Sequence, residues 1–175
     1  DYSKIVLLAK QFPFRNHPLG KLTDEKACRV YLAMLLNIVR LDTEEEVSLN
    51  RFVFIQWLQM ESGIERSIED IFKDCYKISS HSYQEMLDIL PEKYWEYLVV
   101  DALIIANIGG AANTEINEYI AGLVSILGIE KERLHILSFV ARIALCQNIH
   151  RMKKAEIDAV QKCAKAYKHY INAAI

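Results

Sequence analysis

The sequence predicts an all-α fold: a single helical domain of about eight or nine helices that contains an internally duplicated helix pair. Three observations predict it. Apolar side chains recur every three or four residues over 116–127, the spacing that places them on one face of a helix. Residues 31–65 repeat the plan of residues 98–130 in rougher form. The 175 residues include only 6 glycines and 3 prolines, which favours long helices over turn-rich β structure.

The later copy shows the plan most clearly. Its leading helix is expected to begin at Pro91, which has no amide hydrogen to leave unpaired, and to end at the glycine pair 109–110. Asn113 or Thr114 then caps the second helix. Gly128 ends that helix, because glycine adopts the left-handed conformation of a C-cap without strain.

The earlier copy aligns with the later one. Residues 63–65 read Gly-Ile-Glu, as do residues 128–130, and counting back from them places Ser48 on Asn113. Both of these residues are of the kind that caps a helix. Thr23 is the expected N-cap of the leading helix of this copy, since acidic residues follow it directly.

Residues 51–58, RFVFIQWL, are the ambiguous segment. Their aromatic and β-branched side chains suit a buried strand, and periodicity alone does not decide a short apolar run. We predict a helix here because the matching segment of the later copy is helical. No other convincing strand exists in the sequence to pair with this one.

The segments outside the duplicated pair complete the expected organisation. Further amphipathic helices are expected at 68–75, 83–89 and 134–145. The expected parts are an N-terminal helix and irregular arm at 1–22, a duplicated helical core at 23–146, and a C-terminal helix packed on the core at 147–175.

Charge and cysteine content indicate the surroundings of the protein. The formal net charge of −2 gives no general attraction to nucleic acid or to an anionic membrane. The longest apolar stretch, 98–108, is too short to span a bilayer, which needs about 20 residues. The four cysteines lie far apart, without a CxxC pair. They read as free thiols in a reducing compartment, hence a cytoplasmic location, with a metal or disulfide role as the alternative.

Sequence motifs of the common enzyme classes are absent. The chain contains no HExxH, GxSxG, Walker or dinucleotide-binding pattern. The glycine pair 109–110 is better explained as a tight elbow than as a phosphate cradle, since no lysine or arginine lies close to it in sequence. The five histidines show no paired ligand spacing.

Four acidic residues gather at the elbow of the earlier copy: Asp42, Glu44, Glu45 and Glu46. Hard cations such as calcium need several oxygen ligands that converge on one point, and four carboxylates within five residues can supply them. The simpler explanation is that acidic residues before a helix cap it and interact favourably with the positive end of its dipole. A divalent metal ion is therefore the one cofactor that the sequence suggests.

Asp101 is the candidate for a polar site inside the core. Under the alignment of the two copies it falls on Met34, a core position. A buried carboxylate needs a hydrogen-bonding or cationic partner. Arg142 is one candidate because it interrupts an apolar helical pattern, and a tyrosine hydroxyl is another. The alternative places Asp101 at the edge of the apolar stripe, with its oxygens in water.

The two elbows carry a family resemblance. The earlier reads RLDTEEEVS over residues 40–48 and the later ANIGGAANTE over residues 106–115. This pattern resembles the TerB-like domain of tellurite-resistance proteins: a leading helix, an Asp-containing elbow and a second helix capped by acidic residues. The resemblance implies metal binding by the elbow acids, and a role in stress response and in surface complexes at the membrane. The later elbow departs from the family, with Gly109 in place of Asp and Ala111 in place of Glu.

Two functions follow as expectations. The first is a non-enzymatic interaction or sensing module with a protein partner, part of a larger bacterial protein or stress-response complex. The second is a metal-binding stress protein, or a metal-dependent enzyme, that uses the acidic elbow at 42–46. Nucleic acid is not an expected partner, and the sequence suggests no transmembrane segment.

Overall fold

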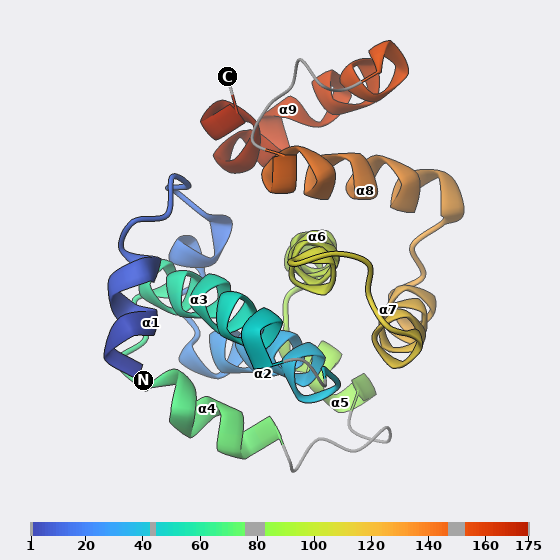
Figure 1. Ribbon diagram of the computed structural model, residues 1–175. Helices are drawn as coiled ribbons and strands as arrows, with labels where there is room; N and C mark the ends of the chain where they lie inside the picture. Colours follow the sequence, from blue (N-terminus) through green and yellow to red (C-terminus); the bar gives the residue numbers. More distant parts are fainter. Residues whose placement is uncertain (1, 43–44, 76–82, 147–152, 175) are drawn as a thin grey trace.

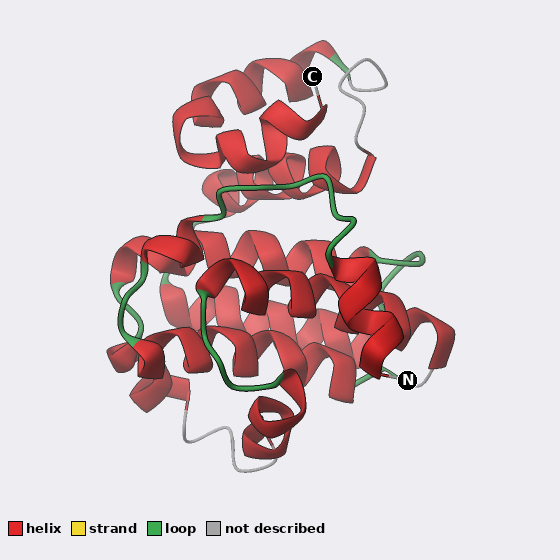
Figure 2. Cartoon of the chain, turned by 90° about the vertical axis from the view of Figure 1, so that its left-hand side faces the viewer, coloured by secondary structure: helices red, strands yellow, loops and turns green. Residues whose placement is uncertain are grey.

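The computed structural model describes residues 2–42, 45–75, 83–146 and 153–174. These residues form nine α-helices and no strand, which confirms the all-α prediction (Figure 2). In chain order the elements are α1 (Tyr2–Ala9), the 3-10 turn η1 (Pro18–Lys21), α2 (Glu25–Arg40), α3 (Glu45–Ser62), α4 (Ile68–Cys75), α5 (Tyr83–Ile89), the 3-10 turn η3 (Glu92–Tyr94), α6 (Trp95–Asn107), α7 (Thr114–Leu127), α8 (Lys131–Cys146) and α9 (Lys154–Ala174).

Helix α6 is the centre of the fold. It packs against α2, α7 and α8, while α9 lies along α8 and α1 lies along α3 (Figure 1). Eight of its 13 residues are buried, on all sides of the helix. A helix that is hydrophobic all round must be covered on every side, so the sequence of α6 makes it the central helix.

The helix boundaries refine those expected from the sequence. The N-cap of α2 is Asp24 rather than Thr23: its Oδ1 accepts hydrogen bonds from the amides of Lys26 and Ala27 at 3.0 and 3.3 Å. The expected helix at Pro91 begins instead as η3, and α6 starts at Trp95.

The predicted caps of α7 are both present. Asn113 accepts a hydrogen bond from the amide of Ile116 at 2.8 Å. Gly128 adopts φ 67°, the left-handed conformation in which glycine ends a helix without strain.

Residues 51–58 are helical, as predicted, and form the middle of α3. Side chains on several faces of this segment are buried, among them Phe54, Ile55, Trp57 and Leu58. The aromatic run therefore reflects a helix enclosed by α1, α2 and the 3-10 turn η1, and burial on several faces hides the helical period in the sequence.

The two helix pairs share one local feature. Helices α3 and α7 both lead into a glycine of positive φ, 73° at Gly63 and 67° at Gly128, and an isoleucine follows each glycine. They differ in burial, because α7 buries a single face through Ile116, Ile120, Leu123 and Leu127. The internal duplication itself stays a proposal.

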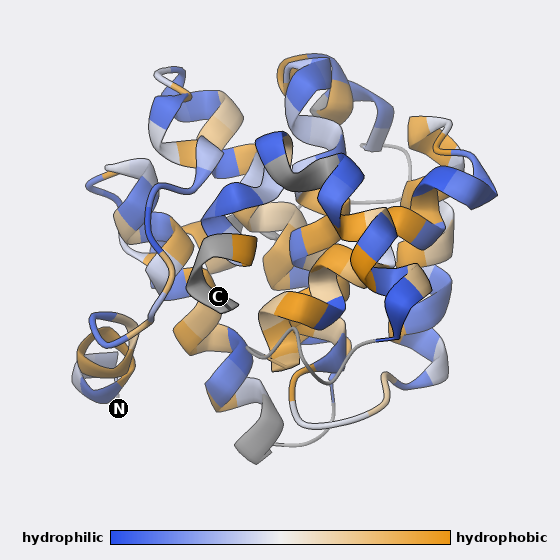
Figure 3. Ribbon diagram, turned by 90° about the horizontal axis from the view of Figure 1, so that it is seen from above, coloured by the Kyte–Doolittle hydropathy of each residue, from blue (hydrophilic) through white to orange (hydrophobic). Residues whose placement is uncertain are grey.

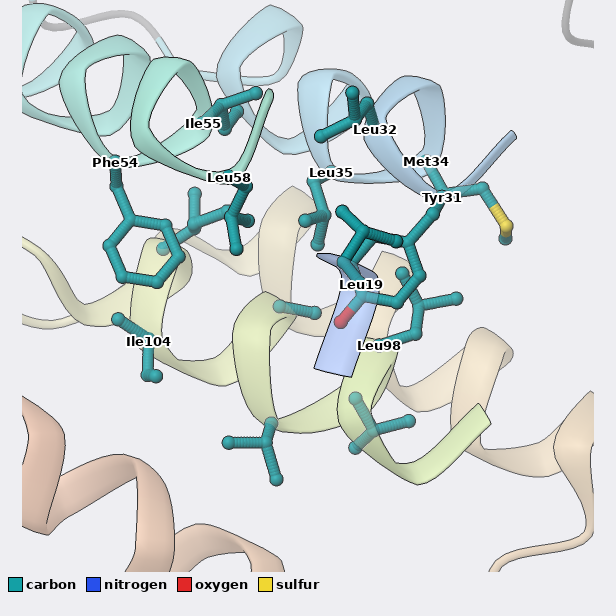
Figure 4. Packing of buried hydrophobic residues seen from close by; sticks show 14 of the residues in the cluster. Leu19, Tyr31, Leu32, Met34, Leu35, Phe54, Ile55, Leu58, Leu98 and Ile104 are labelled. Atoms are coloured by element: carbon teal, nitrogen blue, oxygen red, sulfur yellow. The ribbon is translucent and has the colours of Figure 1, made fainter. Parts of the chain in front are cut away.

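The core lies between α2, α3 and α6. Figure 4 shows Leu35 and Leu58 facing Leu98 and Ile104 across this space, and Figure 3 shows apolar residues concentrated on the helices in the middle of the molecule. Polar groups lie among them too: the ring of Tyr31 extends from α2 toward α6 and carries its hydroxyl into the core (Figure 4).

Candidate functional site

The hydroxyl of Tyr31 meets the carboxylate of Asp101, which is 0% exposed. Oδ2 of Asp101 accepts hydrogen bonds from the Tyr31 hydroxyl and from His17 Nε2, the latter at 2.8 Å, and Oδ1 accepts one from the Tyr170 hydroxyl. We call His17, Tyr31, Asp101 and Tyr170 the Asp101 cluster. Both carboxylate oxygens are therefore satisfied without water.

His17 is held in one tautomer. Its Nδ1 accepts a hydrogen bond from the amide of Leu19 at 2.9 Å, which caps η1. A nitrogen that accepts carries no proton, so the ring proton is on Nε2 and is donated to Asp101. The ring is neutral in this arrangement, and the contact with Asp101 is a hydrogen bond between a neutral donor and a carboxylate.

The two tyrosines also remain neutral. Burial, followed by the negative charge of Asp101, raises the pKa of Tyr31 well above 10, and the same two causes act in the same order on the pKa of Tyr170. Each hydroxyl therefore keeps its proton and donates it to the carboxylate. Within the described part of the chain no lysine or arginine bonds to Asp101, so the cluster is an anion solvated by neutral donors.

Four separate segments meet at the cluster. His17 comes from the arm between α1 and α2, Tyr31 from α2, Asp101 from α6 and Tyr170 from α9. Aromatic rings enclose it: Phe14 packs edge-on against Tyr170 at a centroid distance of 5.0 Å, and Trp57 lies 5.7 Å from the His17 ring. The hydrogen bonds of the cluster therefore link the arm and α9 to the central helix α6.

The burial expected for Asp101 is what the structure shows, but the expectation that Arg142 is its partner is wrong. Arg142 forms an ion pair with Glu156 instead. The carboxylate of Glu156 also accepts a hydrogen bond from the amide of Lys153 at 3.1 Å, at the start of α9. Arg142 thus joins α8 to α9 near the surface, and the tyrosine alternative describes Asp101.

The acidic elbow is arranged around an ion pair. Asp42 Oδ2 lies 2.5 Å from Arg51 Nη1 and accepts a hydrogen bond from Ser48 at 3.2 Å. Arg51 is buried, and its Nε and Nη2 donate to the carbonyls of Ile105 and Ala106 at 2.8 and 2.9 Å. These carbonyls belong to the last turn of α6, so Arg51 closes the end of the central helix.

The other elbow acids are not placed. Glu44 lies outside the described residues, and so do the side chains of Glu45 and Glu46, whose backbone begins α3. In the described part of the chain, no group of three His, Cys, Asp or Glu side chains is arranged to hold a metal ion. Asp42, the one placed member of the predicted set, is already bound by Arg51 and Ser48.

A small apolar hollow opens on the surface between α1, α3 and α4. Its volume is about 210 Å³. Tyr2 and Ile5 of α1, Phe52 of α3, and Ile68, Glu69 and Phe72 of α4 line it. The rings of Phe52 and Phe72, both in the lining, meet edge-on at a centroid distance of 5.6 Å.

The structure places two free cysteines, one buried and one exposed. Cys28 is a free thiol inside the core, where burial raises its pKa to about 11, and Cys146 is free and exposed. No helix in the described ranges is long and apolar enough to cross a membrane.

Comparison with protein-family models, with curated proteins and with solved structures found no match to this chain.

Proposed function

We propose that this chain is a non-enzymatic interaction module that binds a protein partner at the apolar hollow. The observation that carries the proposal is the lining: five apolar side chains from three helices leave a hollow at the surface of the described part of the chain. Apolar side chains usually fill such spaces in a helical core. Hollows of this kind accept the aromatic or aliphatic anchor residue of a partner.

The rim of the hollow defines the chemistry of the partner. Glu69 is the one charged side chain among the described residues of the lining, and it is 70% exposed. Lys73 lies 3.9 Å away on the next turn, a weak surface pair that a partner can replace. We therefore expect an amphipathic segment with an apolar anchor and a lysine or arginine beside it.

Peptide display tests the proposal. A library of helical peptides is selected on the wild-type chain, and the enriched peptides are then measured against three variants. Phe72→Asp places a charge in the hollow and should weaken binding about 30-fold, the loss typical of an anchor position. Glu69→Lys should weaken peptides with basic flanks without disturbing the packing.

Leu7→Asp is the matched control, because Leu7 lies on α1 outside the hollow and is 59% exposed. It should leave binding unchanged, and circular dichroism checks that each variant is folded. Enriched peptides that lack an apolar anchor, or that bind the Glu69→Lys and Phe72→Asp variants as tightly as the wild type, would contradict the proposal.

Kinship with TerB-like domains is a second part of the proposal, together with cytoplasmic location and a place in a bacterial stress-response complex. It rests on the elbow motifs and on the glycine-isoleucine ends that α3 and α7 share. The alternative function, metal binding at the acidic elbow, is less well supported because the carboxylate of Asp42 is paired with Arg51.

A further inference from the structure

Helix α9 changes direction just before it reaches the Asp101 cluster. Tyr167 has φ −118° and ψ 21°, a non-helical conformation that breaks the helix in two. We call residues 168–171, which follow this break, the terminal turn. Three consecutive residues of the turn are buried, namely His169, Tyr170 and Ile171. The break thus allows the end of α9 to point into the core.

His169 is the unusual residue of the terminal turn. It is 7% exposed, and its Nε2 has no hydrogen-bond partner in the part of the chain that the structure describes. Its ring lies against Tyr170 and His17, at centroid distances of 4.2 and 5.0 Å. A buried nitrogen without a partner is costly, and tyrosine would fill the same aromatic space, so packing alone does not account for a histidine here.

The groups that face His169 determine what a proton there would meet. The arm contributes His17, α6 contributes Tyr97 and Asp101, and α9 contributes Tyr167 and Tyr170, while Tyr31 of α2 bonds to the same carboxylate oxygen as His17. Only Asp101 is charged among them, and its two oxygens already accept three hydrogen bonds. A proton held at Nε2 therefore finds no acceptor among the described residues.

We propose that the terminal turn of α9 is an acid-released latch, which leaves the core when His169 takes up a proton. Release carries Tyr170 away from Asp101 and uncovers the rings of Phe14 and Trp57, both of which pack against Tyr170. The device is independent of the apolar hollow, which lies at α1, α3 and α4.

The direction of the pH effect follows from linkage. Burial lowers the pKa of docked His169 from 6.5 to about 3, against the opposing pull of Asp101. The released form therefore binds more protons than the docked form between these values. Docking is fully stable above pH 6.5 and weakens as pH falls toward 3. At pH 5 the ratio of docked to released turn should be lower by about 30-fold.

Amide hydrogen exchange measures the release. Exchange of peptides that cover the terminal turn is followed between about pH 7.5 and pH 5, corrected for the intrinsic pH dependence of exchange. In the wild type the corrected rate in the turn should rise about 30-fold. Residues 137–144 of α8, five of which are buried, serve as the internal reference and should not change.

Variants identify the group that responds. His169→Phe keeps a ring in the same space and should abolish the rise. His169→Gln, a polar and non-titrating side chain, serves the same purpose if the phenylalanine variant does not fold. Tyr170→Phe removes one hydrogen bond to Asp101 and should raise exchange equally at both pH values, which leaves the pH dependence intact.

Three outcomes would overturn the latch. A wild-type turn that exchanges equally at both pH values has no acid release. A rise that persists in the His169 variants assigns the response to another group, such as His17. A rise shared by the α8 reference shows global unfolding rather than release of one turn.

Discussion

Two buried carboxylates in this molecule are stabilised in opposite ways. Asp101 lies at the centre of the core and accepts hydrogen bonds from two tyrosines and a neutral histidine. Asp42 lies at the end of the central helix and is paired with Arg51, a permanent cation that also binds two backbone carbonyls. The first site keeps its negative charge, and the second neutralises it.

The difference teaches how each site should respond to change. A charge solvated by neutral donors depends on all of them together, and each donor is left unsatisfied when the charge is removed. A paired charge depends on one partner, and removal of that partner leaves an uncompensated ion. The Asp101 site also contains groups that titrate, whereas an arginine stays charged at any pH a protein survives.

Asp101→Ala should have the largest effect. It leaves three buried donors without an acceptor, and at 1–3 kcal/mol for each we expect a loss of about 5 kcal/mol in the free energy of unfolding. Asp101→Asn keeps one acceptor oxygen and should cost less, about 2 kcal/mol. Urea denaturation measures both. A loss below about half a kcal/mol for Asp101→Ala would show that the cluster does not hold the core together.

Arg51→Met should be next in size. It retains an apolar chain of similar length but leaves Asp42 buried without its cation, at a cost of about 3 kcal/mol. Arg133→Met is the matched control, because Arg133 pairs with Glu96 through two bonds of 2.6 Å but both side chains are more than one third exposed. Solvent screens such a pair, so the control should lose less than about 1 kcal/mol. Equal losses would erase the distinction between the buried and the exposed ion pair.

High pH should destabilise the Asp101 cluster, which contains titrating tyrosines, but not the ion pair of Asp42 with Arg51. The pKa values of Tyr31 and Tyr170 are raised well above 10, so the folded form keeps both protons after the unfolded chain has lost them. The stabilisation is complete below pH 10 and is lost as pH rises beyond it. At pH 11 each tyrosine should cost about 1.4 kcal/mol.

The measurement is the free energy of unfolding at about pH 8 and pH 11, for the wild type and for Tyr31→Phe, Tyr170→Phe and the double variant. Each single substitution should reduce the loss of unfolding free energy between pH 8 and pH 11 by about 1.4 kcal/mol. If all four proteins lose the same free energy between the two pH values, these tyrosines are not the groups that hold their protons.

Sequence patterns predicted the parts of this fold that one helix determines by itself. The caps at Asn113 and Gly128 depend on local geometry, and residues 51–58 are helical, as predicted from the proposed repeat. The burial of Asp101 was expected from its alignment with the core position Met34, with a solvent-exposed place at the edge of the stripe as the alternative. Such periodicity reports which face of a helix is inside, and it does so without knowledge of the neighbours.

The partners of Asp101 could not be predicted in the same way. They lie 69–84 residues away in the sequence, on an arm and two helices whose packing the periodicity does not specify. Arg142 was a reasonable expectation because it interrupts an apolar pattern, yet it lies at the edge of α8, 49% exposed, where it reaches Glu156. A break in an apolar stripe marks either a buried polar site or the edge of the stripe, and only the packing distinguishes them.

The smallest expected effect concerns calcium at the acidic elbow. A metal ion that uses Asp42 must first displace Arg51, which is fixed by two carbonyls of α6. We therefore expect calcium at about 1 mM to add less than about 0.4 kcal/mol to the stability of the wild type, the gain when the dissociation constant exceeds the concentration. Thermal denaturation with and without the ion measures it.

The Arg51→Met variant sharpens this test, since it removes the guanidinium from the carboxylate of Asp42. A cation should then bind where the guanidinium was, and calcium should restore part of the lost stability. In the Arg51→Met/Asp42→Asn double variant the uncompensated charge is absent, so stability should recover without the ion and calcium should have no effect. Should calcium instead raise the melting temperature of the wild type, and Asp42→Asn abolish that rise, then Asp42 leaves Arg51 for a metal and the elbow is a metal site.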